Sequence, residues 1–182
     1  MQKERIKAEI MDEAAVNRAL TRMAHEIAER NHGTEDIVLV GVLRRGKALA
    51  QRLAKAIERF EGVEIPCGEL DIDHYRDDLG AQRDMPILHK AELPFSIVNR
   101  KVVLVDDVLY TGRTVRAAIE AIFALGRPRA IQLAILIDRG HRELPIRADY
   151  VGKSIPTSHQ EEVSVRIPPY DEQTAVVLLE RE

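Results

Sequence analysis

Residues 102–114 read VVLVDDVLYTGRT, and this stretch decides the fold. Four apolar residues run into two adjacent carboxylates, Asp106 and Asp107, and a short turn then leads into a helical pattern. Such an apolar run is typical of a strand that is buried on both faces of a parallel sheet. The turn at 111–114 presents backbone N–H groups at a helix start, where anions bind readily. The stretch therefore predicts a buried strand that ends in acids beside an anion site.

The same strand–turn–helix pattern recurs on both sides of this stretch. Apolar or alternating runs predict further strands at 37–41, 69–73 and 131–137. Apolar periodicity predicts a helix that stops at Gly33 and two more at 47–60 and 114–125. This repetition indicates an α/β fold, with a mostly parallel sheet flanked by helices. We expect a single domain over residues 1–182, with short strands between 150 and 179.

The composition is that of a globular chain with little net charge. Of its 182 residues, 45% are hydrophobic and 31% are charged, which disfavours disorder. The formal charge of −3 gives no global reason for nucleic-acid binding, so a local basic face would have to supply it. The single cysteine, Cys67, excludes an internal disulfide and favours a cytoplasmic location. No apolar run approaches the roughly 18 residues that a membrane span requires.

Three turns rich in charge or glycine follow the predicted strands, at 43–46, 106–114 and 138–142. In sheets of this class the ligand lies at the carboxyl ends of the strands, so we expect the three turns to form one pocket. Carboxylates beside an anion cradle suit a molecule that carries both sugar hydroxyls and a phosphate. This combination points to a phosphorylated ribose. The polar segment at 74–91 is expected to be a long loop or hairpin that serves the same pocket.

The segment 41–48, GVLRRGKA, nearly matches the phosphate-binding loop of nucleotide triphosphatases. It follows a predicted strand and opens a predicted helix, as that loop does. However, Ala48 stands where the pattern requires the hydroxyl that binds Mg²⁺, and two arginines are unusual inside a backbone phosphate nest. We therefore disfavour this alternative, which steady hydrolysis of ATP or GTP would revive.

The segment 102–114 resembles the signature of type I phosphoribosyltransferases, in which an apolar strand and two acids precede a T-G-x-T phosphate loop. The segments 70–79 (LDIDHYRDDL) and 138–150 (DRGHRELPIRADY) are similar to one branch, the bifunctional pyrimidine operon attenuators of the PyrR family. The resemblance implies the type I phosphoribosyltransferase fold with a flexible loop or hairpin over the site. It also implies uracil phosphoribosyltransferase activity, which converts uracil and phosphoribosyl pyrophosphate (PRPP) into UMP and pyrophosphate.

The resemblance assigns roles to residues around the expected pocket. Asp106 and Asp107 would bind the ribose hydroxyls and help to hold the Mg²⁺ that accompanies PRPP. Arg45 completes the expected catalytic set, and Arg44 and Arg45 would bind the pyrophosphate. The other expected substrate-binding residues are Arg83, Val108, Leu109, Tyr110, Thr111, Gly112, Arg113, Thr114, Arg139 and Val163. Tyr75 and Arg76 are further candidates in the polar segment.

The same resemblance implies binding to the leader mRNA of a pyrimidine operon, a response to UMP or UTP, and a homodimer or higher homo-oligomer. The expected RNA-binding residues are Thr21, Arg22, His25, Arg142, Arg147 and Lys153. Thr21 and His25 are four residues apart, so they should share one helix face. The alternative is a hypoxanthine or guanine phosphoribosyltransferase without RNA binding. Purine enzymes of this type carry an acid near the position of Tyr110, so the tyrosine argues against a purine base.

Overall fold

The computed structural model describes residues 4–72 and 93–181, and its centre is a parallel sheet of five strands. The strands are β2 (Ile37–Val42), β3 (Cys67–Leu70), β4 (Lys101–Leu109), β5 (Ala130–Asp138) and β6 (Tyr150–Ser154). They lie in the order β3-β2-β4-β5-β6, with every neighbouring pair parallel. The strand that carries the paired acids, β4, is the middle strand. The predicted α/β architecture is thus confirmed.

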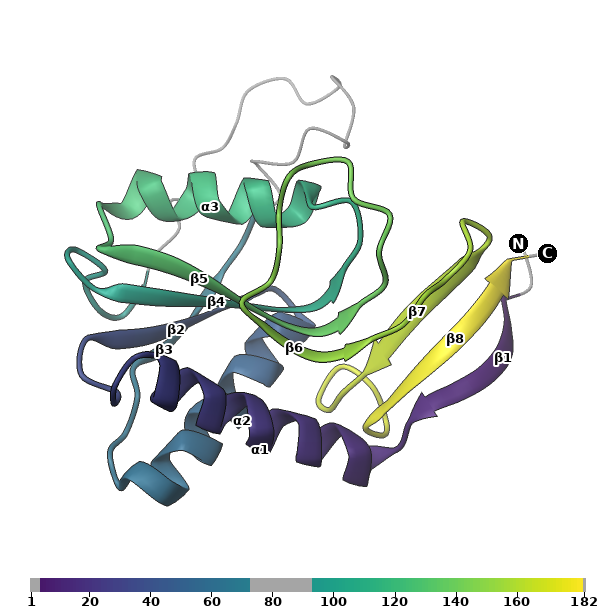
Figure 1. Ribbon diagram of the computed structural model, residues 1–182, viewed down its shortest axis with the longest axis horizontal. Coiled ribbons are helices and arrows are strands. Elements are labelled where there is room, and N and C mark those ends of the chain that lie inside the picture. Colours follow the sequence, from purple (N-terminus) through teal and green to yellow (C-terminus); the bar gives the residue numbers. More distant parts are fainter. Residues whose placement is uncertain (1–3, 73–92, 182) are drawn as a thin grey trace.

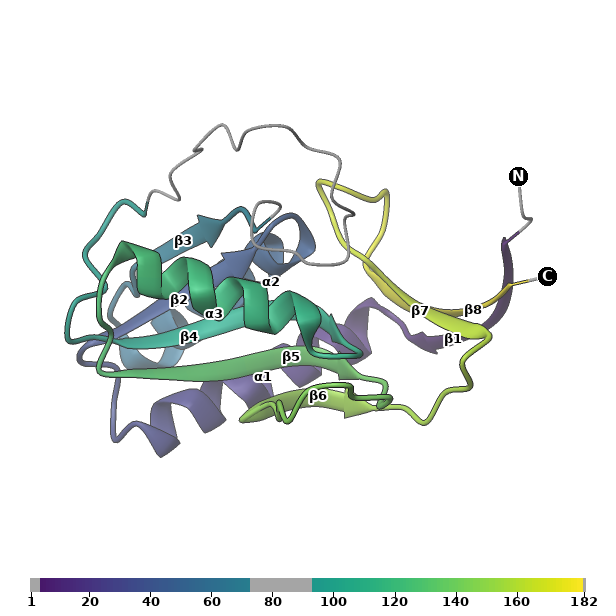
Figure 2. The same cartoon turned by 90° about the horizontal axis from the view of Figure 1, so that it is seen from above.

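Helices cover both faces of this sheet, as Figure 1 shows. One face is covered by α1 (Glu13–Arg30) and α2 (Arg45–Glu61), and the other by α3 (Arg113–Leu125), which lies over β4 in Figure 2. The predicted apolar stripe of α1 is confirmed, because Val16, Leu20, Met23 and Ile27 are all buried. Residues 102–105 of β4 are buried from both sides, which explains their continuous apolar character.

A second sheet of three antiparallel strands projects from this body (Figures 1 and 2). It consists of β1 (Glu4–Met11), β7 (Glu161–Arg166) and β8 (Ala175–Arg181), with β8 in the middle. The short strands predicted after residue 150 are confirmed, but the sequence analysis did not predict β1. The available signal was the alternation of Ile6, Ala8 and Ile10 with charged residues.

Two further predictions concern the segment between β3 and β4. The strand predicted at 69–73 is observed at Cys67–Leu70, so it begins two residues earlier and ends three residues earlier, because its pairing with β2 runs from Cys67 to Leu70. The predicted loop at 74–91 lies outside the described residues, as do Tyr75, Arg76 and Arg83.

Within 4–72 and 93–181, none of the helices combines the length and the apolar character that crossing a membrane requires.

Candidate active site at the carboxyl edge of the sheet

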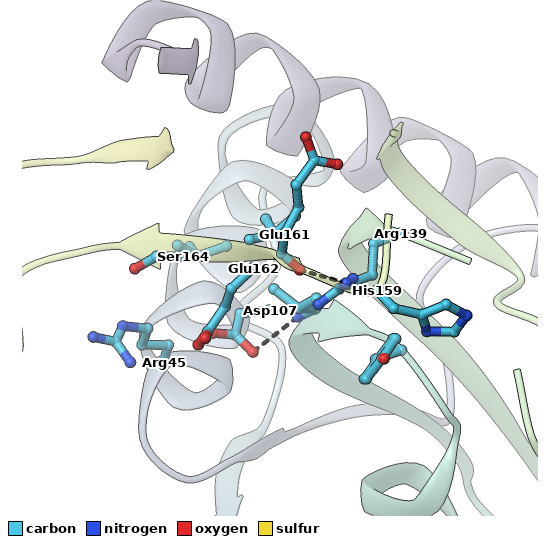
Figure 3. Close-up of a pocket in the computed structure, with 11 residues that line it drawn as sticks. Arg45, Asp107, Arg139, His159, Glu161, Glu162 and Ser164 are labelled. Atoms are coloured by element: carbon cyan, nitrogen blue, oxygen red, sulfur yellow. Dashed lines mark hydrogen bonds between the residues drawn. The ribbon is translucent and has the colours of Figure 1, made fainter. Parts of the chain in front are cut away.

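A cavity of about 360 Å³ lies at the carboxyl end of β4. The three turns expected to converge all contribute to it, through Arg45, through Asp107 and Tyr110, and through Arg139. The opposite wall comes from the antiparallel sheet and the residues before it, which include His159, Glu162 and Val163 to Val165. In Figure 3, Asp107 and Glu162 lie toward the middle of the cavity, with Arg45 on one side and Arg139 on the other.

The paired acids are held by the backbone that follows them. Asp106 is buried, and its Oδ1 accepts a hydrogen bond from the Asp107 N–H at 2.9 Å. Asp107 is partly buried, and its Oδ1 accepts one from the Val108 N–H at 2.8 Å. Burial raises the pKa of Asp107, while the bond from Val108 and the positive charge of Arg45 oppose that rise. Both carboxylates are therefore fixed in orientation, and Asp107 lines the cavity whereas Asp106 does not.

The basic turn at 43–46 packs directly against these acids. A Cβ atom at Gly46 would lie 2.5 Å from the Val105 carbonyl oxygen and 3.4 Å from Asp106 Oδ1, so the close approach requires glycine. Arg45 lines the cavity at the start of α2. The side chain of Arg44 is exposed and does not line the cavity. Of the two arginines expected to bind pyrophosphate, the structure brings Arg45 to the site.

A second hollow, of about 270 Å³, adjoins the first and shares Val108 and Tyr110 with it. It is formed by residues 108–115 together with Glu143. Gly112 has a φ of 95°, which allows the turn between β4 and α3. The carbonyl oxygen of Thr111 accepts hydrogen bonds from the N–H groups of Glu143 and Leu144, which tie this turn to the next loop. Because the first N–H groups of α3 have no preceding helical turn, this hollow suits a phosphate.

Arg139 is buried at the side of the cavity opposite Arg45 (Figure 3). Its guanidinium lies 4.0 Å from the centroid of the Tyr110 ring. It also donates to Thr157 Oγ1 and to the carbonyl oxygens of Ser158 and Glu161. Arg139 therefore fixes Tyr110 and the start of β7 around the cavity, and most of its donors are engaged by the protein.

Four of the six residues expected to bind RNA lie on α1 and β6, two elements that contact each other. Arg22 on α1 donates to the carbonyl oxygens of Val151 and Gly152 on β6, the strand that carries the exposed Lys153. His25 is exposed, and its ring stacks on Phe60 with centroids 3.9 Å apart. Thr21 is also exposed on α1, and the exposed Arg147 precedes β6.

Arg142 differs from the rest of this set. Its guanidinium donates to Asp138 Oδ2 at 2.6 Å, and to the carbonyl oxygens of Tyr110 and Ile146 at 2.9 Å each. These bonds hold the 138–146 loop against the turn between β4 and α3. The structure therefore gives Arg142 a role inside the fold rather than on an exposed basic surface.

Sequence reasoning missed several residues that the structure places at or beside the site. His159, Glu162 and Ser164 line the cavity wall, and Asp171 pairs with Arg45 across the cavity rim. They lie more than 110 positions after Arg45, so no local pattern connects them to it. Val163 does line the cavity, as expected, and it belongs to the same wall on β7.

Comparison with known proteins places the chain in a family. Residues 7–170 match the phosphoribosyl transferase domain family. The chain is 60% identical to the bifunctional protein PyrR of Pelotomaculum thermopropionicum, over 97% of each chain. The chain belongs to the PyrR family. A second member, from a Thermoanaerobacter species, is 58% identical over 97% of this chain and 99% of that protein.

Solved structures support the fold of this PyrR-family chain. The hypoxanthine phosphoribosyltransferase of Trypanosoma cruzi superimposes with a TM-score of 0.74 over 97% of this chain and 98% of that one, at 22% identity. The hypoxanthine phosphoribosyltransferase of Staphylococcus aureus gives 0.71 over 94% of this chain and 92% of that one, at 21% identity. At these identities the likeness establishes the type I phosphoribosyltransferase fold and carries no argument about the base.

Proposed function

We propose that the chain is a uracil phosphoribosyltransferase that also binds RNA, attenuating transcription of pyrimidine biosynthesis genes in response to pyrimidine nucleotides. One observation carries the enzymatic part. Asp107 at the end of β4 lines a cavity to which Arg45 also contributes, and this cavity adjoins a phosphate-sized hollow at the start of α3. This arrangement matches, in order, the sugar, the pyrophosphate and the 5′-phosphate of PRPP.

The reaction moves charge in a direction that the site is built to accept. As the bond to pyrophosphate breaks, positive charge develops on the sugar carbon and negative charge on the leaving group. Asp106 and Asp107 would hold the ribose hydroxyls near the positive sugar, and Arg45 would stabilise the departing pyrophosphate. Uracil would lie against the wall formed by Val163 and its neighbours on β7. Catalysis then follows mainly from positioning and electrostatics.

Mg²⁺ is proposed to enter with PRPP as part of the substrate. The cation prefers hard oxygen ligands, commonly one or two carboxylates together with substrate phosphates. The adjacent carboxylates of Asp106 and Asp107, of which Asp107 lines the cavity, fit that donor set. These residues would hold the ion, which would supply positive charge to the pyrophosphate.

The choice of base tests the proposal directly. When uracil, hypoxanthine, guanine and orotate are offered separately with PRPP, we expect UMP to form at least about 100-fold faster, in kcat/KM, than any other product. The reason is that Tyr110, held beneath Arg139, offers no acid to a purine ring. Product formation is measured by chromatography. A preference for hypoxanthine or guanine would contradict the proposal.

The exposed residues expected to bind RNA form the proposed RNA face: Thr21, Arg22, His25, Arg147 and Lys153. Because this face is separate from the cavity, a change in it should affect RNA binding without affecting uracil turnover. Lys153→Ala is expected to weaken leader-RNA binding and to lower the slope of log affinity against log salt concentration by about 1, because one phosphate contact is lost. Uracil turnover should stay unchanged, since Lys153 is exposed on β6 and does not line the cavity. Filter binding at several salt concentrations measures the slope.

The matched control is Arg127→Ala, which removes an exposed cation before the amino end of β5, whereas Lys153 pairs with Ile137 near the carboxyl end of that strand. It should leave both RNA affinity and the salt slope unchanged. If Arg127→Ala and Lys153→Ala weaken binding equally, RNA attraction is diffuse and the proposed face is wrong.

A further inference from the structure

Arg45 is held by a carboxylate that no part of the expected site includes. Its Nε–H and Nη2–H donate to Asp171 Oδ2 and Oδ1 at 3.0 and 2.9 Å, which is a two-point ion pair. Asp171 Oδ2 also accepts a hydrogen bond from the Ile167 N–H at 2.8 Å. Both side chains are partly buried. The carboxylate is thus fixed by its own loop, and it fixes the guanidinium in turn.

This ion pair spans two parts of the molecule that line the same cavity. Arg45 begins α2 on the body, whereas Asp171 lies in the loop between β7 and β8. The strand before that loop, β7, supplies the wall from Glu161 to Val165. Asp171 therefore connects the wall where the base would lie to the arginine that would meet the pyrophosphate.

The geometry leaves part of the guanidinium available. An arginine has five N–H donors in a planar fork, and Asp171 uses one on Nε and one on Nη2. Within residues 4–72 and 93–181, no hydrogen bond from Nη1 is observed, and the Arg45 side chain is 38% exposed. A long side chain that is oriented before the ligand arrives loses less conformational freedom on binding.

The electrostatic balance supports the same arrangement. Hydrogen bonding to Asp171 raises the pKa of Arg45, and hydrogen bonding to Arg45 lowers the pKa of Asp171. Both groups therefore stay charged across the physiological range. The negative charge of Asp107 raises the pKa of Arg45 further, so two carboxylates favour the charged guanidinium.

We propose that Asp171 is a positioning residue that orients Arg45 toward the pyrophosphate of PRPP. The inference rests on the proposed phosphoribosyltransferase function, because it assigns Arg45 to the leaving group. Asp171 itself contacts neither the sugar nor the base in this assignment. Its loss should affect ligands that carry pyrophosphate and spare ligands that lack it.

The same loop offers a matched control. Thr174 Oγ1 accepts a hydrogen bond from Arg52 Nη2 at 3.0 Å, so Thr174 also ties the loop to α2, without touching Arg45. Thr174→Val removes that tie and keeps the shape of the side chain. It reports what a general loosening of the loop does to the site.

The experiment measures pyrophosphate and UMP binding by calorimetry in the presence of Mg²⁺, together with the KM for PRPP. For Asp171→Asn we expect the Kd for pyrophosphate and the KM for PRPP to rise about tenfold, as for loss of a charge-assisted positioning contact. The Kd for UMP should stay within about twofold of the wild type. Asp171→Glu should restore most of the pyrophosphate affinity, and Thr174→Val should leave all three quantities unchanged.

Three outcomes overturn the proposal. The first is a pyrophosphate Kd for Asp171→Asn within about twofold of the wild type. The second is an equal loss of UMP and pyrophosphate binding, and the third is an equal effect of Thr174→Val. Pyrophosphate binding can be measured without turnover. A wild-type protein that binds pyrophosphate but does not use uracil would therefore refute the proposed function, and the pyrophosphate Kd of the variants would still test the role of Asp171.

Discussion

Replacing Asp107 with asparagine is expected to lower uracil phosphoribosyltransferase turnover about 100-fold to 1,000-fold, as for loss of a group that stabilises transition-state charge. Binding to leader RNA should remain unchanged. The amide oxygen can still accept the Val108 N–H bond, so the local backbone should persist. What is lost is the negative charge beside the developing sugar cation. Steady-state kinetics and filter binding on the same preparation measure the two quantities.

The stability of the Asp107→Asn variant separates lost charge from misfolding. Because burial raises the pKa of Asp107, the folded protein binds this proton more tightly than the unfolded chain does. Stability therefore falls as pH rises from the unfolded pKa, near 3.9, through the raised folded pKa. At pH 7 the charged form costs folding free energy, and asparagine removes that cost. We expect a Tm equal to or above that of the wild type at pH 7, with the difference shrinking as pH falls.

A lower Tm together with lost RNA binding would show that Asp107→Asn disturbs the fold, and the catalytic assignment would then lose its support. Equal loss of turnover and RNA affinity at an unchanged Tm would contradict separate sites.

Gly46→Ala is expected to lower the free energy of unfolding by about 3 kcal/mol, the upper part of the range for forcing an extra methyl group into a packed interior. The added Cβ would lie 2.5 Å from the Val105 carbonyl oxygen, and neither backbone segment can move without shifting Asp106. We also expect the KM for PRPP to rise, because the start of α2 carries Arg45. Denaturant melts and steady-state kinetics measure both effects.

The control for Gly46→Ala is Gly62→Ala at the other end of α2. There φ is +72°, and an added Cβ meets no atom within 4 Å. The expected cost is about 1 kcal/mol of backbone strain, with unchanged kinetics. If Gly46→Ala were no more costly than Gly62→Ala, or left the KM for PRPP unchanged, the close contact between the turn and the acids would not matter to the site.

The sequence was most informative where local pattern and global fold agree. Residues 102–114 predicted a buried strand that ends in two acids and a turn into a helix, and β4 and α3 show that order. That this turn binds a phosphate stays a prediction. The convergence of three turns followed from a general property of parallel sheets and needed no knowledge of side chains. The family resemblance then supplied the activity, which the fold alone would not have distinguished from that of a purine enzyme.

What could not be predicted depends on contacts between distant residues. Arg45 and Asp171 are 126 positions apart, and their pairing depends on where the loop after β7 folds back. The stacking of His25 on Phe60 likewise depends on the packing of α1 against α2. Arg142 looked like a surface cation because its partners are mostly carbonyl oxygens, which no sequence pattern reveals.

The strand order of the antiparallel sheet has a consequence for synthesis on the ribosome. β1 is made first, yet its partner is β8, whose residues are made more than 160 positions later. β7 also pairs with β8, so the pairing of β7 cannot form until β8 has been synthesised. Pairings so distant in sequence form late, because a long loop must close before any contact compensates for its entropy. The parallel sheet can assemble earlier during translation, but the cavity wall on β7 is completed last, so a nascent chain gains its catalytic capacity only after β8 has emerged.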